Sequence, residues 1–325
     1  MTVLTGLSAF SITPSDAGGH VDVVALRKLV ARLCAADVDS IGLLGSTGSY
    51  LYPSRSERRR ALDAALNETS GRLPILVGVG ALRTDEAVRL AQDAKAAGAA
   101  AGLLAPVSYT PLNEEEVFEH FATVASESGL PLCIYDNPST THFRFSPALV
   151  GRLSRVAGII AVKSPAPESP AVATHLAELR PLVPEGFSLG YSGDWNAVEA
   201  LLAGGDAWYS VVAGLFPSVS MAIVRAVRNG DAAEARRLNA TLEPLWALFK
   251  EFSSLRVMYA CADLLDLCRA EPPRPILPLS RAARQRVADT LEASDLMPLL
   301  FTLGFRKSRM SERGVSGTDR PPPDD

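Results

Sequence analysis

The chain has 325 residues, of which 47% are hydrophobic and 21% are charged, and its formal net charge is −4. This composition is typical of a globular protein with a sizeable core, and it argues against a disordered chain. The mildly acidic balance provides no basic surface for nucleic acid, and no lysine and arginine cluster alternates with aromatic residues. We therefore do not expect nucleic acid as a partner.

The cysteines predict a reduced protein. Cys34, Cys133, Cys261 and Cys268 show no CxxC spacing, so we expect neither structural zinc nor disulfides. The first residues lack the basic and apolar regions of a signal peptide, and no uninterrupted apolar run reaches the ~18 residues of a membrane helix. These features favour a cytoplasmic protein without a membrane segment.

Along the first two thirds of the chain, short apolar segments typical of strands alternate with amphipathic segments typical of helices. The expected strands are 7–12, 40–44, 74–79, 101–105, 132–135, a strand carrying Lys163, 187–190 and 207–212. The expected helices between them are 23–33, 57–66, 84–97, 113–126, 147–153, 171–179 and 196–203. Eight strand–helix units joined by short loops predict a (β/α)8 TIM barrel, because each crossover returns right-handed to the same sheet. An open doubly wound sheet is the alternative.

After Pro217 the strand pattern stops, and helical patterns cover 219–228, 232–252, 255–267 and 281–291. We therefore expect a catalytic barrel over 1–217 and a C-terminal helical domain over 218–306. The segment 307–325 is rich in serine, glycine and proline and has too few apolar residues to order itself, which predicts a flexible tail.

Lys163 follows four apolar residues, 159–162, and Ser164 and Pro165 stop the strand directly after it. A lysine at the end of a buried strand is costly unless it is exposed, paired or chemically used. A neutral lysine amine attacks carbonyl carbon, which is the first step of Schiff-base catalysis. The alternative is a lysine that extends from the strand end into a polar rim.

Other candidate residues follow other strands, and the active site of a TIM barrel lies at the C-terminal ends of its strands. The segment 45–48, Gly-Ser-Thr-Gly, forms a turn whose amides and hydroxyls suit a carboxylate. Tyr135 ends the fifth strand, and Ser192 follows the seventh. Each pattern alone is weak, because ordinary strand-to-helix turns and half-buried tyrosines are common.

Taken together, these motifs resemble the dihydrodipicolinate synthase / N-acetylneuraminate lyase family. The motifs are GSTG after the second strand, YDNPSTT after the fifth, AVKS at Lys163, SGD after the seventh and GGDAWYSVVAG at the eighth. The resemblance covers roughly residues 4–300 and implies a (β/α)8 barrel with a C-terminal helical domain. It also implies a homo-oligomer, a dimer or tetramer, and a class I aldolase or lyase that needs no metal or organic cofactor.

The resemblance assigns a role to each matching residue. Lys163 is expected to form an imine with the keto carbon of pyruvate or another 2-oxo acid, and Tyr135 is expected to relay protons. Ser46 and Thr47 match the hydroxyl pair that holds the substrate carboxylate with its amides. Gly45, Ser192 and Tyr209 complete the expected substrate-binding set.

The chain also departs from the family's pattern. Thr140 stands where dihydrodipicolinate synthases carry an arginine that binds the carboxylate of the aldehyde substrate, and Arg144 is a displaced candidate for that charge. Ser108 stands where those enzymes have a tyrosine that completes a proton relay across subunits, and Tyr109 is displaced by one residue. Ser49 replaces the glutamate of the GTTGE motif.

Bulky residues replace small aliphatic ones at the eighth strand. Trp208 and Tyr209, with Tyr191 and Trp195, predict a pocket with aromatic and hydroxyl walls. Such walls suit a sugar acid or a neutral or aromatic aldehyde better than a second carboxylate.

We therefore expect a Schiff-base lyase or aldolase that cleaves, condenses or dehydrates a 2-keto-3-deoxy or hydroxy-oxo acid. One alternative is dihydrodipicolinate synthase proper, and another is a barrel that binds a 2-oxo acid or sugar acid without turnover. A phosphosugar barrel is a third, for which Ser192-Gly193 and Gly204-Gly205 are only faint phosphate-binding turns.

Overall fold

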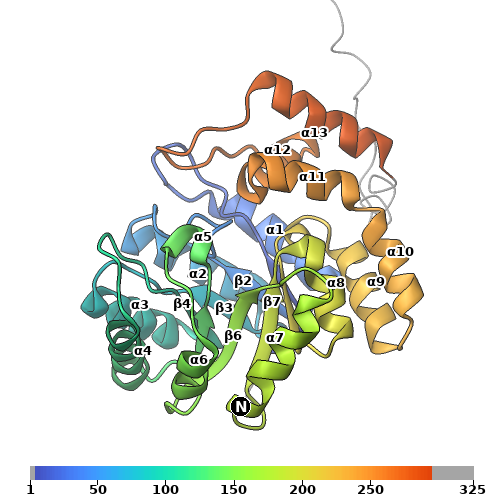
Figure 1. Ribbon diagram of the computed structural model, residues 1–325. Coiled ribbons are helices and arrows are strands. Elements are labelled where there is room, and N and C mark those ends of the chain that lie inside the picture. Colours follow the sequence, from blue (N-terminus) through green and yellow to red (C-terminus); the bar gives the residue numbers. More distant parts are fainter. Residues whose placement is uncertain (1–3, 295–325) are drawn as a thin grey trace, which may run out of the picture.

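The computed structural model describes residues 4–294. Eight parallel strands close into a barrel in sequence order, and β8 pairs back onto β1 (Figure 1). The strands are β1 Gly6–Phe10, β2 Ser40–Leu43, β3 Ile75–Gly78, β4 Ala101–Leu104, β5 Leu132–Tyr135, β6 Ile159–Pro165, β7 Ser188–Ser192 and β8 Ala207–Ser210. The prediction of a (β/α)8 barrel is confirmed, and the open sheet is wrong.

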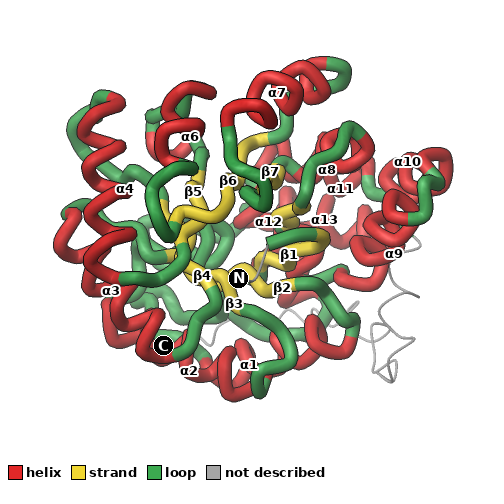
Figure 2. The backbone as a smooth tube through the Cα atoms, turned by 90° about the horizontal axis from the view of Figure 1, so that it is seen from below, coloured by secondary structure: helices red, strands yellow, loops and turns green. Residues whose placement is uncertain are grey.

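Helices surround the strands on the outside of the barrel (Figure 2). They are α1 Val23–Ala35, α2 Arg55–Thr69, α3 Thr84–Ala97, α4 Glu114–Ser128, the short α5 Pro138–Thr141, α6 Pro147–Leu153, α7 Ala171–Leu179, α8 Asp194–Leu202 and α9 Pro217–Arg228. Local sequence sets many of their ends: Asn113 and Glu116 form a capping box at α4, and Gly98 ends α3 in the left-handed region. Every strand is therefore followed by a helix, as the alternation predicts.

The chain after the barrel is helical, with α10 Ala232–Ala240, α11 Glu243–Phe252, α12 Ser254–Leu264 and α13 Arg281–Ala293. The expectation of one continuous helix over 232–252 is wrong. Pro244 lies in the first turn of α11, where its missing amide hydrogen costs nothing, and in a helix interior it would break the helix. None of the helices in residues 4–294 is long and apolar enough to cross a membrane.

The helix α9 packs against β1 and α8 and takes the place of the barrel's eighth helix. We therefore describe α9 with the barrel, and the division at residue 217 stays a prediction. The predicted tail, 307–325, lies outside the described residues. The four cysteines are free.

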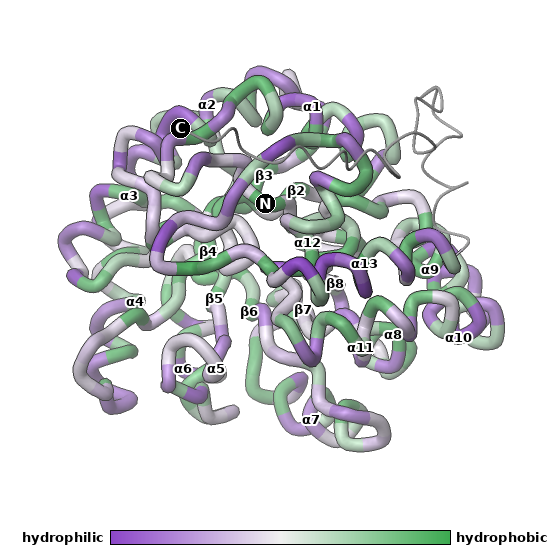
Figure 3. Tube along the Cα trace, turned by 90° about the horizontal axis from the view of Figure 1, so that it is seen from above, coloured by the Kyte–Doolittle hydropathy of each residue, from purple (hydrophilic) through white to green (hydrophobic). Residues whose placement is uncertain are grey.

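Two apolar cores are separated by the barrel wall. Neighbouring residues of a strand point to opposite faces, so Trp208 packs between the sheet and its helices, whereas Tyr209 points into the barrel. Both side chains are fully buried. Gly190 leaves room for the Tyr209 ring, because a Cβ there would overlap it. Viewed from above, the strands at the centre carry few hydrophilic residues (Figure 3).

The helices α11 to α13 lie above the barrel (Figure 1). Backbone hydrogen bonds tie this region to the loop between β1 and α1. The amide of Glu271 donates to the carbonyl of Ser15 at 3.1 Å, and the amide of Arg274 donates to the carbonyl of Ala17 at 3.0 Å. The loop therefore fixes the chain before α13 over the mouth of the barrel.

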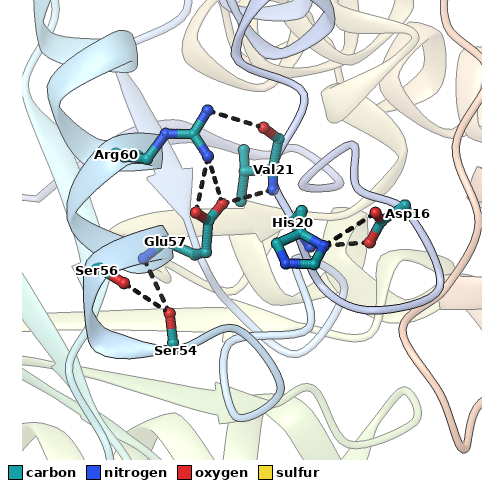
Figure 4. Close-up of polar contacts among 7 residues, drawn as sticks. All are labelled: Asp16, His20, Val21, Ser54, Ser56, Glu57 and Arg60. Carbon is teal, nitrogen blue, oxygen red and sulfur yellow. Dashed lines mark hydrogen bonds and ion pairs between the residues drawn. The ribbon is translucent and has the colours of Figure 1, made fainter.

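The same loop is also held to the start of α2 (Figure 4). The carboxylate of Glu57 accepts a hydrogen bond from the amide of Val21 at 2.7 Å and pairs with Arg60 at 2.7 Å. Asp16 and His20 bond to each other within the loop, 3.0 Å apart. Hydrogen bonds donated by the amide of Val21 and by Arg60 lower the pKa of the Glu57 carboxyl, so this anchor persists into mildly acidic solution.

Candidate active site

A cavity of about 770 Å³ opens at the C-terminal ends of the strands, beneath α11 and α12. Its inner end, as we use the term, is lined by strand ends and their turns: Phe10, Ser46, Thr47, Tyr135, Asn137 and Lys163. Its outer end is lined by residues of α8, α11, α12 and the chain that follows: Trp195, Phe249, Ser253, Ser254, Leu255 and Ile276. This location is where TIM barrels carry their active sites.

Lys163 is buried at the inner end, with 3% of its surface exposed. Its Nζ lies 3.9 Å from the ring centroid of Phe10, 4.3 Å from that of Tyr135 and 5.9 Å from that of Tyr209. Tyr135 is its register partner on β5. The amine therefore lies among aromatic faces inside the cavity, and the alternative of a lysine extended into a polar rim is wrong.

Three polar side chains interlock beside this amine. The hydroxyl of Tyr135 donates to Oγ of Ser46 at 3.0 Å. The amide nitrogen of Asn137 donates to both oxygens, at 2.9 Å to Tyr135 and 3.3 Å to Ser46. Because Asn137 occupies acceptor positions on both hydroxyls, it orients the proton of Tyr135 toward Ser46. Asn137 lies in the YDNPSTT motif, but no pattern in the sequence points to this role.

The turn after β2 has the geometry expected of a carboxylate site. Its backbone closes through the amide of Ser49, which donates to the carbonyl of Ser46 at 3.0 Å, and the amide of Tyr50, which donates to Gly45 at 3.3 Å. Within residues 4–294, the amides of Ser46 and Thr47 make no hydrogen bond. Two amides and two hydroxyls are therefore available to an anion at the inner end. Gly45 itself does not line the cavity and lies against Phe10.

The SGD motif supports the site from behind. The fully buried carboxylate of Asp194 accepts hydrogen bonds from Nε1 of Trp208 at 2.9 Å and from the amides of Val211 at 3.1 Å and Val212 at 2.7 Å. Burial raises the pKa of this carboxyl, and these hydrogen bonds oppose that shift. Asp194 therefore joins the end of β7 to the end of β8. Ser192, also predicted for the site, lines the cavity.

The predicted aromatic wall is correct for Trp195, which lines the cavity, and wrong for Trp208, Tyr191 and Tyr209. Trp208 and Tyr191 face the surrounding helices, where Tyr191 bonds to His175 at 3.1 Å. Tyr209 lies in the barrel interior beyond Lys163, and burial raises the pKa of its hydroxyl well above the usual value. Strand alternation, which places one face of β8 inside the barrel, explains these positions.

Thr140, Arg144 and Tyr109 are the positions discussed above as departures from the family's pattern, and only the first lines the cavity. Thr140 lines the cavity, and its hydroxyl donates to the carbonyl of Asn137 at 3.2 Å. Arg144 is exposed and does not line the cavity. Tyr109 is 98% exposed and also lies outside it. Within one chain, neither residue reaches the inner end.

Tyr50 is a cavity residue that the sequence analysis missed. Its buried side chain lies beside Arg58, whose guanidinium is 5.7 Å from the ring centroid and donates to the carbonyls of Gly78 and Gly80 at 2.8 and 3.2 Å. Burial raises the pKa of the Tyr50 hydroxyl and lowers that of Arg58 to about 10. Tyr50 therefore presents a neutral phenol to the cavity. In the sequence, the one indication of this role is that Tyr50 directly follows Ser49, the residue that replaces the glutamate of the family's motif.

Comparison with known proteins places the chain among its relatives. A model of the dihydrodipicolinate synthetase family matches residues 3–294. The 4-hydroxy-tetrahydrodipicolinate synthase of Methylococcus capsulatus is 33% identical over 286 residues, 88% of this chain and 97% of that protein.

Solved structures agree with the sequence matches. The dihydrodipicolinate synthase of Agrobacterium tumefaciens superposes with a TM-score of 0.87 at 58% identity, over 89% of this chain and 97% of that one. A putative dihydrodipicolinate synthetase of Pseudomonas aeruginosa superposes with a TM-score of 0.82 at 30% identity, over 89% of this chain and 99% of that one. These matches confirm the family resemblance and the prediction of an enzyme. The chain is a lyase and belongs to the dihydrodipicolinate synthetase family.

Proposed function

We propose that this lyase forms an imine between Lys163 and pyruvate or a related 2-oxo acid, and then makes or breaks a bond at the neighbouring carbon. One observation carries the proposal: the buried amine of Lys163 lies at the inner end of the cavity, 4.3 Å from the Tyr135 ring centroid. A pure binding protein would require neither a nucleophilic amine nor the hydroxyl pair beside it. The non-catalytic alternative is therefore disfavoured.

The arrangement assigns a role to each group. The lone pair of the Lys163 amine attacks the keto carbon, the former keto oxygen leaves as water after protonation, and the resulting iminium withdraws electrons from the adjacent carbon. Tyr135 and Ser46, 3.0 Å apart, supply and accept the protons. The free amides of Ser46 and Thr47 hold the carboxylate in place while the charge develops.

The lining of the cavity favours an uncharged remainder of the substrate. Among the lining residues that the structure describes, Lys163 is the single cationic side chain, and Asp194, the single acidic one, is already hydrogen-bonded by Trp208 and two amides. A carboxylate-bearing aldehyde needs a cation, for which arginine has the best geometry. Thr140 has none. We therefore propose aldol cleavage, condensation or dehydration of a 2-keto-3-deoxy or hydroxy-oxo acid.

The second candidate is the activity for which the Methylococcus capsulatus relative is named, 4-hydroxy-tetrahydrodipicolinate synthesis. The 33% identity over most of both chains favours it. Within residues 4–294 the cavity lining contains no cation besides Lys163, which disfavours it. A coupled assay with pyruvate and aspartate semialdehyde separates the two: efficient formation of the cyclic product would establish this candidate and refute our preference.

Borohydride trapping tests the imine. The protein is incubated with each member of a panel of 2-oxo acids, reduced, and analysed by intact mass and peptide mapping. We expect one reduced adduct per chain on Lys163. Lys250 is the natural competitor, because its Nζ lies 5.5 Å from the ring centroid of Trp195 at the outer end. Adduct on Lys250 or Lys95, or adduct that persists in Lys163→Ala, would refute the assignment.

We also propose that the protein is a cytoplasmic homo-oligomer, a dimer or a tetramer. Its four free cysteines fit a reducing compartment. Large apolar side chains are exposed on the loops after β2, β3 and β4: Leu51, Tyr52, Leu82 and Tyr109. Such a group of side chains fits a contact between copies. Light scattering during gel filtration gives the number of chains, and a single chain at micromolar concentration would contradict the oligomer.

A further inference from the structure

Phe10, the last residue of β1, supplies the aromatic face closest to the reacting amine. The ring is 1% exposed, lines the cavity, and has its centroid 3.9 Å from Nζ of Lys163. That distance is well inside the range of cation–π attraction, which extends to about 6 Å. The contact joins the first and the sixth strand across the barrel.

The neighbouring strand is built to admit this ring. Gly42, the register partner of Phe10 on β2, lies so close that a Cβ there would overlap the ring, and a Cβ at Gly45 would be 2.7 Å from it. Two glycines therefore form a slot that any side chain would close. Tyr209 fixes the ring from another side, edge to face, at 6.0 Å between centroids and 82° between planes. The ring is thus held in one orientation.

Among residues 4–294, the one carboxylate that interacts with Lys163 is already hydrogen-bonded elsewhere. The titratable groups around the amine in this part of the chain are Tyr135 and Cys133 on β5, Tyr209 on β8, and Asp194 at the start of α8. Burial raises the pKa of the Cys133 thiol to about 12 and raises that of Tyr209, so both stay neutral. Both carboxylate oxygens of Asp194 accept hydrogen bonds, from Trp208 and from the amides of Val211 and Val212.

We propose that Phe10 is a positioning residue that holds the cationic nitrogen of the Lys163 iminium on its ring face. This inference rests on the proposed function. In the step concerned, the amine and the keto group take up one proton, the C–N bond forms, and water leaves with the electrons of the C–O bond. In the attacking amine the nitrogen carries no charge, and in the iminium it is positive. A ring face in contact with that nitrogen therefore favours the iminium over the neutral amine.

Fluorination of the ring tests this without changing its shape. Phe10 is replaced through an expanded genetic code by 4-fluoro-, 3,5-difluoro- and pentafluorophenylalanine, which weaken the negative ring face in steps. Each protein is trapped with pyruvate and borohydride between pH 7 and 11. Because the iminium loses its proton in alkaline solution and the neutral imine is reduced more slowly, trapping falls as the pH rises. We expect the pH of half-maximal trapping to fall along the series, by about one pH unit for a tenfold loss of iminium.

The matched control is the same series at Phe121, a fully buried ring that packs edge to face on Phe145 at 5.6 Å, away from the cavity. It should leave the trapping midpoint unchanged. If the midpoint is also constant across the Phe10 series, the inference is overturned while the proposed function stands. If the parent protein itself gives no adduct with pyruvate or any longer 2-oxo acid, the proposed function fails first.

A second test acts through the slot. Gly42→Ala should displace the ring and lower pyruvate trapping at pH 9 several-fold. Gly102→Ala places a Cβ 2.9 Å from Leu130 on the helix side of β4 and serves as the matched control for crowding in a strand. Thermal unfolding shows whether both variants fold. Equal trapping by two folded variants would overturn the role of the slot.

Discussion

The inner and outer ends of the cavity are built differently. At the inner end, Tyr135, Asn137 and Ser46 are bonded to one another, and the amine of Lys163 lies beside them on neighbouring strands. The outer end is formed by Trp195 on α8 and by α11, α12 and the chain that follows, and the described residues that line it have apolar or hydroxyl side chains. Lys250 lies nearby, against the Trp195 ring, and is not one of these lining residues. The comparison indicates that the inner end determines the reaction at the 2-oxo acid, and that the outer end determines which remainder of the substrate is accepted. Changes at the two ends should therefore have different kinetic signatures.

The largest effect is expected at the nucleophile. Lys163→Ala should lose turnover by roughly 10⁴-fold or more, because it removes the only amine side chain among the described residues that line the cavity. Lys95→Ala, on the exposed surface of α3, is the control and should behave as the parent. Initial rates of pyruvate release decide the matter. Turnover by Lys163→Ala within tenfold of the parent would contradict covalent catalysis.

The proton relay should follow. Tyr135→Phe is expected to lose turnover by a factor on the order of 10² or more, since a positioned acid/base contributes about 10² to 10⁴. Trapping of the imine should be slowed less than turnover. Tyr191→Phe removes a buried hydroxyl that bonds to His175 outside the cavity, and it controls for the loss of a phenol. Equal activity of Tyr135→Phe and the parent would remove the relay from the mechanism.

A smaller effect is expected where the substrate is selected. Thr140→Arg supplies the missing cation, so condensation of pyruvate with aspartate semialdehyde should rise about tenfold. Imine trapping with pyruvate alone should stay the same, because the inner end is unchanged. Thr140→Gln has similar bulk without the charge and should show no gain. If the parent already condenses the two substrates efficiently, the outer end does not select as we propose.

The smallest effect concerns stability at the inner end. Asp136 lies in the chain between Tyr135 and Asn137, whose side chains are hydrogen-bonded to each other. Its side chain is buried, and its Oδ1 has no hydrogen-bond partner among the described residues. Burial raises the pKa of its carboxyl from 3.8 to about 6. A raised carboxyl pKa means that stability is complete below about pH 3.8 and is lost as the pH rises through about 6.

Replacing Asp136 by asparagine should therefore help more at pH 8 than at pH 4, by an amount on the order of 1 to 3 kcal/mol. Urea unfolding at the two pH values measures the difference. Asp289→Asn, at an exposed carboxylate that accepts from Gln285 at 2.8 Å, is the control for the general effect of replacing an aspartate by asparagine. An identical change in unfolding free energy at both pH values would refute the account of Asp136.

The barrel could be predicted from sequence because its signal is local and repeated. Each strand is a short apolar segment, and the helix 84–97 was predicted with the bounds observed. The break between α10 and α11 was missed, since a helical apolar pattern continues through Pro244. Lys163 and Tyr135 could be singled out because both follow apolar segments in a specific motif.

Two kinds of feature could not be predicted from the sequence: the side of a strand or turn to which a side chain points, and contacts between residues far apart in the chain. A tryptophan and a tyrosine side by side on β8 look alike as pocket residues, yet Trp208 faces the helices and Tyr209 the barrel interior. Phe10 and Gly42 are far apart in the chain, and only strand pairing shows that one makes room for the other. Tyr50 lines the cavity because of the conformation of the turn after β2, and the sequence of that turn does not indicate where the side chain points.

A crystal structure of the protein soaked in pyruvate tests the central claim most directly. We predict continuous electron density from Nζ of Lys163 to the second carbon of pyruvate, with the carboxylate at the amides of Ser46 and Thr47. The ring of Phe10 should lie against the iminium nitrogen, about as far from it as it now lies from the amine. Pyruvate bound in the cavity without a covalent bond, or joined to another lysine, would contradict the account.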